Sequence, residues 1–117
     1  MVASCMFCRI VAGLAPADVV REWDDVIAIR PLDPVTPGHV LVIPHTHVVD
    51  VGEDAFVSAR TMSCAAELAA VLPAANVITS KGSAATQTVA HLHLHVVPRT
   101  AGDHLPLPWT PQQQPAG

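Results

Sequence analysis

The segment Gln87–Arg99, with the sequence QTVAHLHLHVVPR, decides the fold that we expect for this chain. Its histidines at positions 91, 93 and 95 alternate with Leu92, Leu94 and Val96. Successive side chains of a β-strand point to opposite faces, so a strand over Val89–Val97 puts the three imidazoles on one face and the apolar residues on the other. Neighbouring imidazoles then stand roughly 6.6 Å apart, too far for a direct hydrogen bond. Each ring must therefore meet a different partner.

The rest of the chain reads as one sheet and two helices. The pattern predicts a short helix over Met6–Val11, strands at Val26–Ile29, His39–Pro44 and Asn76–Thr79, and a main helix over Asp54–Leu72 that Pro73 terminates. The expected fold class is α+β, with an antiparallel sheet of about five strands. We expect residues 1–104 to form one domain, and the Pro- and Gln-rich residues 105–117 to form an extended or partly disordered tail.

Composition limits the classes of partner. The 117 residues are 50% hydrophobic and only 14% charged, which suits one small domain with a core. A formal net charge of -4 leaves no basic face for polymeric nucleic acid, although a small nucleotide remains compatible. No apolar run approaches the ~18 residues that span a bilayer, and no secretory pattern is visible. We therefore expect a cytoplasmic protein without a membrane partner.

The histidine face has three competing interpretations on the residues alone. It is the outer face of a half-exposed strand, a three-histidine metal site, or a catalytic site in which one imidazole acts as nucleophile between two that shape its charge. Seven histidines against six Lys and Arg make this the unusual feature of the composition.

A second motif is the Cys-x-x-Cys pair of Cys5 and Cys8. Two thiolates at this spacing can bind one metal ion, and they need two further ligands to complete a tetrahedral zinc site. The alternatives are two reduced cysteines on a short helix, or a redox pair. Cys64 stands alone in an Ala-rich helical stretch and is expected to be a small buried residue.

The string His91–Val97 resembles the signature of the histidine triad (HIT) superfamily of nucleotide hydrolases and transferases. CMFCRIVAG at 5–13, PVTPGHVLVIP at 34–44 and Gln87 are also similar to this family, particularly to its bacterial nucleoside phosphoramidase and diadenosine polyphosphate hydrolase branch. The resemblance implies a two-fold dimer. It also implies a reaction at the α-phosphate of nucleoside phosphoramidates, adenylates or dinucleoside polyphosphates, through a covalent nucleotidyl-histidine.

The same resemblance assigns roles to the histidines and to the residues around the phosphate. His93 is the nucleophile, His95 donates to the phosphate oxygens and assists the leaving group, and His39 is an additional active-site histidine beside the triad, which His91 completes. The implied phosphate contacts are Gln87, Thr88, Ser80 and Gly82. The implied purine pocket is apolar, and each member could equally belong to the core: Met6, Phe7, Ile10, Leu32 and Leu41.

The resemblance further implies a structural zinc ion bound by Cys5, Cys8, His47 and His91. One departure from the family concerns the ribose, because Pro31 occupies the position of an aspartate that holds the ribose hydroxyls, and Asp33 follows two residues later. This departure favours an alternative function, a non-catalytic HIT scaffold with structural zinc that binds a nucleotide or a protein. Because Lys and Arg are scarce, we expect imidazoles, Gln87, Thr88 and backbone amides to hold the phosphate.

Overall fold

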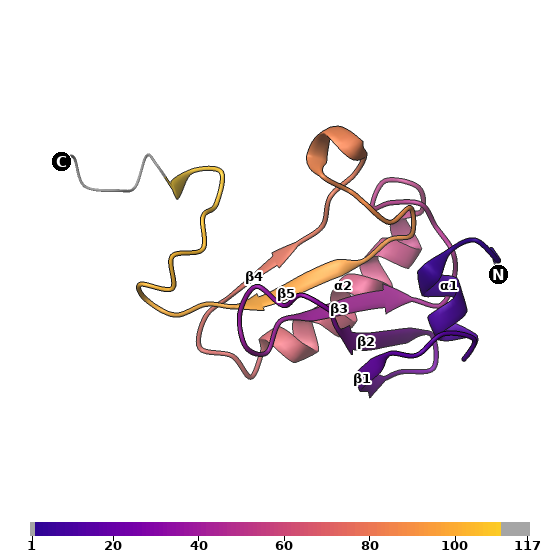
Figure 1. The fold of residues 1–117 in the computed structure, drawn as a ribbon, viewed down its shortest axis with the longest axis horizontal. Helices are drawn as coiled ribbons and strands as arrows, with labels where there is room; N and C mark the ends of the chain where they lie inside the picture. The colour runs from indigo at the N-terminus through magenta and orange to yellow at the C-terminus, as the bar shows by residue number, and fades with distance from the viewer. Residues whose placement is uncertain (1, 111–117) are drawn as a thin grey trace.

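Five strands form one antiparallel sheet in the order β1-β2-β3-β5-β4. The computed structural model describes residues 2–110, so the predicted tail beyond residue 110 lies outside the described residues. The elements, in chain order, are α1 (Met6–Val11), β1 (Asp18–Glu22), β2 (Val26–Arg30), β3 (Val40–Pro44), α2 (Ala55–Ala69), β4 (Ala75–Ile78), the short 3-10 turn η1 (Ser83–Ala85) and β5 (Leu94–Pro98). Figure 1 shows their arrangement. The α+β class and the five-stranded antiparallel sheet are confirmed.

The three central strands bring distant parts of the chain into register. β2 and β3 pair as a hairpin in which Ile27 lies opposite Ile43, and β3 then pairs with β5 so that Leu41 lies opposite His95. On the other side of β5, His95 lies opposite Ile78 of β4. His95 therefore lies on an inner strand of the sheet, between two apolar neighbours.

The two faces of the sheet are covered by different helices. Leu92, Leu94 and Val96 pack with Cys64 and Ala65 of α2 in one core cluster, as the alternation predicts. Asp54 caps α2, since its side chain accepts from the backbone N–H groups of Phe56 and Val57. On the opposite face, Phe7 and Cys8 of α1 pack against the β2 and β3 residues Ile27, Ile29, Leu41 and Ile43. This second face carries the histidines.

The strand predictions miss β1 and misplace the start of β5. β1 was not expected, because all five of its residues are exposed and it has no apolar alternation to bury. β5 begins at Leu94 rather than Val89. Its predicted first half leaves the ladder because the backbone N–H of Leu92 donates to the Val48 carbonyl and the His91 ring turns toward the N-terminal cysteines.

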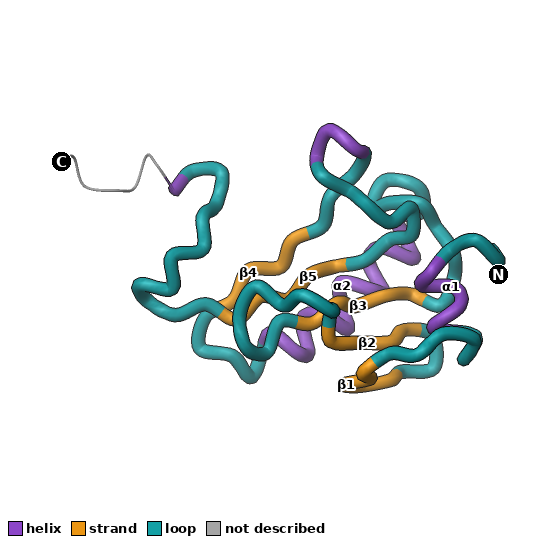
Figure 2. The backbone as a smooth tube through the Cα atoms, viewed as in Figure 1, coloured by secondary structure: helices purple, strands orange, loops and turns teal. Residues whose placement is uncertain are grey.

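Figure 2 shows long loops at one end of the sheet, around η1, and after β5. Among residues 2–110, no helix has the length and apolar character needed to cross a membrane.

Candidate functional site

An open groove of about 1130 Å³ lies on the α1 face of the sheet. It brings together His39, His93 and His95 with residues from α1, from the β2–β3 turn and from the η1 loop. The predicted substrate-contacting residues that line it are Met6, Phe7, Ile10, Leu32, Leu41, Ser80, Gln87 and Thr88. His91 and Gly82 do not line it. Segments that are far apart in the sequence thus meet in one cavity.

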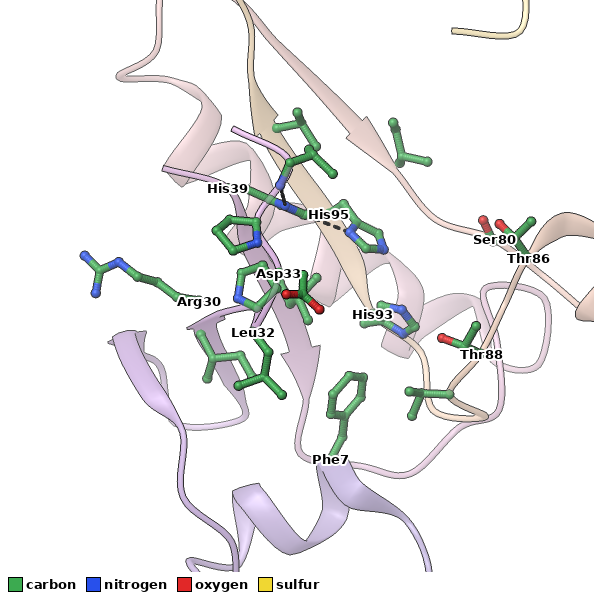
Figure 3. A pocket seen from close by; sticks show the side chains of 18 of the residues that line it. Phe7, Arg30, Leu32, Asp33, His39, Ser80, Thr86, Thr88, His93 and His95 are labelled. Atoms are coloured by element: carbon green, nitrogen blue, oxygen red, sulfur yellow. Dashed lines mark hydrogen bonds between the residues drawn. The ribbon is translucent and has the colours of Figure 1, made fainter. Parts of the chain in front are cut away.

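His93 presents a free ring nitrogen to this groove. Its Nδ1 lies 2.8 Å from the His91 carbonyl oxygen, which can only accept, so Nδ1 carries the proton and donates. In the neutral ring, Nε2 then keeps its lone pair. The Phe7 ring packs edge-on against the His93 imidazole, with the two ring centroids 5.1 Å apart (Figure 3). One backbone carbonyl and one aromatic ring therefore fix both the tautomer and the orientation of His93.

His39 and His95 form a hydrogen-bonded pair. The backbone N–H of Val35 donates to His39 Nδ1 at 3.1 Å, so the His39 proton must be on Nε2. His39 Nε2 then donates to His95 Nδ1 at 2.9 Å, which Figure 3 marks as a dashed line. His95 is left with its proton on Nε2. A single backbone amide thereby sets the tautomer of two rings.

Both members of this pair are neutral near pH 7. Burial lowers the pKa of His95 to about 4, and the neighbouring His93 and His39 rings act in the same direction because they disfavour a further positive charge. Burial also lowers the pKa of His39 below its ordinary value. His95 is thus a hydrogen-bond donor rather than a resident cation.

The wall formed by the η1 loop is held in place by Gln87. Its Nε2 donates to the carbonyls of Val49 at 2.7 Å and Val89 at 3.0 Å, and its Oε1 accepts from the Gly82 N–H at 2.8 Å. In Figure 3, Ser80 and Thr88 lie across the groove from His39.

The apolar end of the groove lies beside His93. Phe7 and Leu41 are buried there, whereas Met6 is 55% exposed and Leu32 is 99% exposed. Two of the residues predicted for the purine pocket therefore stand free of the core, with apolar surface available to a ligand. Figure 3 shows the Asp33 carboxylate between Leu32 and His93, on the groove side of the turn.

The two cysteines meet His47 and His91 in one cluster behind the groove. One ligand atom from each residue lies within 4.8 Å of every other. His91 Nδ1 is 3.3 Å from Cys5 Sγ and 3.1 Å from His47 Nδ1, and Cys8 Sγ is 3.2 Å from His47 Nδ1. Tetrahedral zinc with Cys and His ligands has ligand-to-ligand edges of roughly 3.3–3.8 Å. The donor set and its spacing fit a zinc ion.

Protonation in this cluster supports the same fit. His91 is 0% exposed and donates from Nε2 to the Pro44 carbonyl at 2.8 Å, which leaves Nδ1 free to bind a metal. Burial lowers the pKa of His91, which favours the neutral imidazole that binds a metal, and raises the pKa of the Cys5 thiol. A thiolate at Cys5 would therefore need a cation nearby, and a divalent metal would supply it. The carbonyl of the same His91 orients His93, so His91 connects the cluster to the groove.

Several groove residues were not found from the sequence. Beyond His95 the lining continues with Ile78, Val97, Arg99 and the segment Leu105–Leu107. Val97 and Arg99 could have been found, because positions 93, 95, 97 and 99 share one face of a strand. No local pattern signals that Leu105–Leu107 folds back onto the groove.

Comparisons with known proteins show the family and the fold. The HIT domain model matches residues 12–102. An uncharacterized HIT-like protein of Mycobacterium tuberculosis is 38% identical over 108 residues, covering 86% of this chain and 75% of its own. A crystal structure of a Zn-bound histidine triad family protein from Mycobacterium smegmatis is 40% identical, with a TM-score of 0.75 over 88% of this chain and 80% of that one. A HIT family hydrolase from Clostridium thermocellum is 31% identical, with a TM-score of 0.77 over 87% of this chain and 96% of that one. The chain belongs to the HIT domain family.

Proposed function

We propose that this protein is a nucleotide hydrolase or nucleotidyl transferase that works through a covalent intermediate on His93. Its substrates are nucleoside phosphoramidates, adenylates or dinucleoside polyphosphates, and the reacting atom is the α-phosphorus. The observation that carries the proposal is the 2.8 Å bond from His93 Nδ1 to the His91 carbonyl, which leaves Nε2 to carry the lone pair of the neutral ring. An imidazole held in this tautomer and orientation is a competent nucleophile.

The reaction has two displacements at one phosphorus. His93 Nε2 attacks, a bond forms from Nε2 to phosphorus, and the bond from phosphorus to the leaving nitrogen or oxygen breaks. The leaving group departs with the electron pair and takes a proton as an amine, or departs as an anion. Water, or another acceptor in a transferase, then attacks phosphorus and loses a proton, and His93 Nε2 leaves with its electron pair restored.

His95 and the η1 wall stabilise the charge that develops. His95 Nε2–H donates to a phosphoryl oxygen or to the leaving atom, because its Nδ1 is occupied by His39. Ser80, Thr88 and the region held by Gln87 face the same space and supply hydroxyl and amide contacts. The base rests on Phe7, Ile10, Leu41 and the exposed Met6 and Leu32.

Zinc has a structural role in this proposal. Cys5, Cys8, His47 and His91 would hold it, and it would fasten the start of α1 to the segments beside β3 and β5. All four positions are protein ligands, so the site offers no open coordination position for a substrate. A homodimer with two-fold symmetry remains part of the proposal, and size-exclusion chromatography with light scattering tests it.

The test is amine release from adenosine 5'-phosphoramidate. We expect turnover by the wild-type protein and a loss of at least ~100-fold in His93→Ala, because the nucleophile is removed. His45→Ala, which removes another imidazole and leaves the groove intact, should retain wild-type turnover. Wild-type turnover in His93→Ala would contradict the assignment. Tight nucleotide binding with no turnover would instead support the non-catalytic scaffold.

A further inference from the structure

The groove continues past the reacting centre along β5. His95, Val97 and Arg99 follow His93 on the same face, and all four line the groove. Val97 stands roughly 6.6 Å beyond His95 along the strand. This end is bounded by Ile78, which lies opposite His95 in β4, and by the segment Leu105–Leu107. The groove therefore has apolar walls on both sides of the imidazoles.

Arg99 and Asp103 fix the segment Leu105–Leu107 as a wall. Arg99 Nε and Nη2 donate to the two Asp103 oxygens at 2.8 and 2.9 Å, and Nη2 also donates to the Leu105 carbonyl at 2.8 Å. Asp103 in turn accepts from the Leu105 N–H at 3.1 Å. The pair is mostly buried, with 20% and 12% of the two side chains exposed, and the Arg99 guanidinium holds the pKa of the Asp103 carboxyl well below its usual range. Figure 2 shows the segment after β5 turning back on itself where these bonds form.

The groove has little uncompensated positive charge with which to neutralise a polyphosphate. Among the described residues, the cationic side chains that line it are Arg30 and Arg99. Arg30 pairs with Asp18 at 3.1 Å and points away from the imidazoles in Figure 3, while Arg99 is committed to Asp103. Asp33 adds a negative charge. A chain of several phosphates at this end would be poorly compensated.

We propose that Leu105–Leu107, held by Arg99 and Asp103, selects the group displaced from phosphorus, and that this group is bulky, apolar and not anionic. The inference rests on the proposed function, because it assumes attack by His93. Phosphoryl displacement places the attacking and leaving atoms roughly in line, so the leaving group projects away from His93. Past His95 the groove is lined by Val97, Ile78 and the wall, which are apolar, and by Asn76, whose Oδ1 accepts from Arg99 Nη1 at 2.6 Å. Arg99 is a positioning residue here, since it acts through the wall.

Two phosphoramidates of adenosine 5'-monophosphate test this inference, one made from methylamine and one from cyclohexylmethylamine. Both are primary alkylamines of similar basicity, so they differ mainly in apolar bulk. We expect wild-type kcat/KM to be roughly tenfold higher for the cyclohexylmethyl substrate, since discrimination of this size is typical of an apolar pocket. Leu105→Ala, Leu107→Ala and Arg99→Gln should reduce that ratio toward one, through a fall in kcat/KM for the cyclohexylmethyl substrate. Diadenosine tetraphosphate should be a poorer substrate than the cyclohexylmethyl compound.

Leu14→Ala and Arg60→Gln are the matched controls. Leu14 is 57% exposed outside the groove, and Arg60 pairs with Asp25 at 2.9 Å, also outside it. Both variants should keep the wild-type ratio. An equal ratio in wild type and wall variants, or faster turnover of diadenosine tetraphosphate, overturns the inference alone. No turnover of either phosphoramidate by the wild type overturns the proposed function and this inference with it.

Discussion

His39 Nε2 lies 2.9 Å from His95 Nδ1, and His39 itself is held through Nδ1 by the backbone N–H of Val35. The His95 ring is therefore oriented by the backbone N–H of Val35, which acts through His39. The relationship explains how His95 can present a donor to a phosphate while it remains neutral. It also makes His39 a positioning residue whose loss should affect the reaction more than binding.

Replacement of His39 by alanine tests this relationship. Without the Nε2 donor, His95 can adopt either tautomer and either ring orientation, and a part of the donor's catalytic contribution is lost. We expect kcat to fall by roughly 10- to 100-fold with a smaller change in KM. Steady-state kinetics on adenosine 5'-phosphoramidate measures both, with His45→Ala as the control. A change confined to KM would contradict the positioning role.

The low pKa of His95 predicts the acid limb of the activity profile. Because the pKa is about 4, lowered from 6.5, the ring stays neutral until the pH approaches that value. Below that pH, His95 Nδ1 is protonated. It can then no longer accept the hydrogen bond from His39 Nε2. We expect the His95-dependent part of kcat to decline only as the pH nears about 4. A limb near pH 6.5 that disappears in His95→Gln would contradict the burial argument.

The same pKa predicts a pH dependence of stability. Between pH 6.5 and about 4 the unfolded chain holds a proton on His95 that the folded protein does not bind. The contribution of His95 is therefore fully present above about pH 6.5 and is lost as the pH falls toward 4. Urea unfolding at pH 7 and pH 5 measures this loss. Acid release of zinc affects every variant, so the informative quantity is the difference from His95→Gln, which should lose less stability than wild type.

Zinc removal should loosen the fold at a defined place. We expect one zinc ion per chain, and loss of that ion in Cys8→Ser together with a fall in Tm of several degrees. Cys64→Ser is the matched control for zinc content, since Cys64 packs in the α2 core and is not among the four clustered ligands. Metal analysis measures the zinc content of each variant, and thermal melting measures its Tm. Full zinc content in Cys8→Ser would remove this cysteine from the ligand set.

Gln87 offers a test of the η1 wall. Gln87→Glu replaces the Nε2 donor with an oxygen, which then faces the carbonyls of Val49 and Val89. The carboxylate oxygen and the two carbonyl oxygens repel one another, so Gln87→Glu should disturb the η1 wall more than Gln87→Ala does. We expect faster amide hydrogen exchange in residues 80–87 and a raised KM for nucleotide substrates. Equal behaviour of the two variants would show that these hydrogen bonds do not hold the wall.

The sequence predicts this fold where its periodicity is local, and fails where distant contacts decide. α1 was predicted to the residue, and α2 differs only at its ends, where Asp54 is the cap rather than the first helical residue. β1 has no buried face to produce an alternating pattern, so only its pairing with β2 defines it. The start of β5 was misplaced because His91 turns toward Cys5, Cys8 and His47, a contact across more than forty residues.

The candidate site, like the fold, could be predicted where local spacing determines it and not where distant contacts do. His93, His95 and His39 lie together as the strand spacing and the family resemblance implied. The tautomers could not be predicted, since they depend on the carbonyl of His91 and the amide of Val35. The far end of the groove depends on Arg99 binding Asp103, and neither residue stands out in the sequence.

The covalent intermediate is the central claim, and trapping it is the most direct test. Wild-type protein is mixed with adenosine 5'-phosphoramidate, quenched by denaturant without acid to preserve the phosphorus–nitrogen bond, and analysed by intact mass and peptide mapping. We expect a mass increase of one adenylyl group on the peptide that contains His93, and no such increase in His93→Gln. Turnover without any adduct, or an adduct that persists in His93→Gln, would contradict this claim.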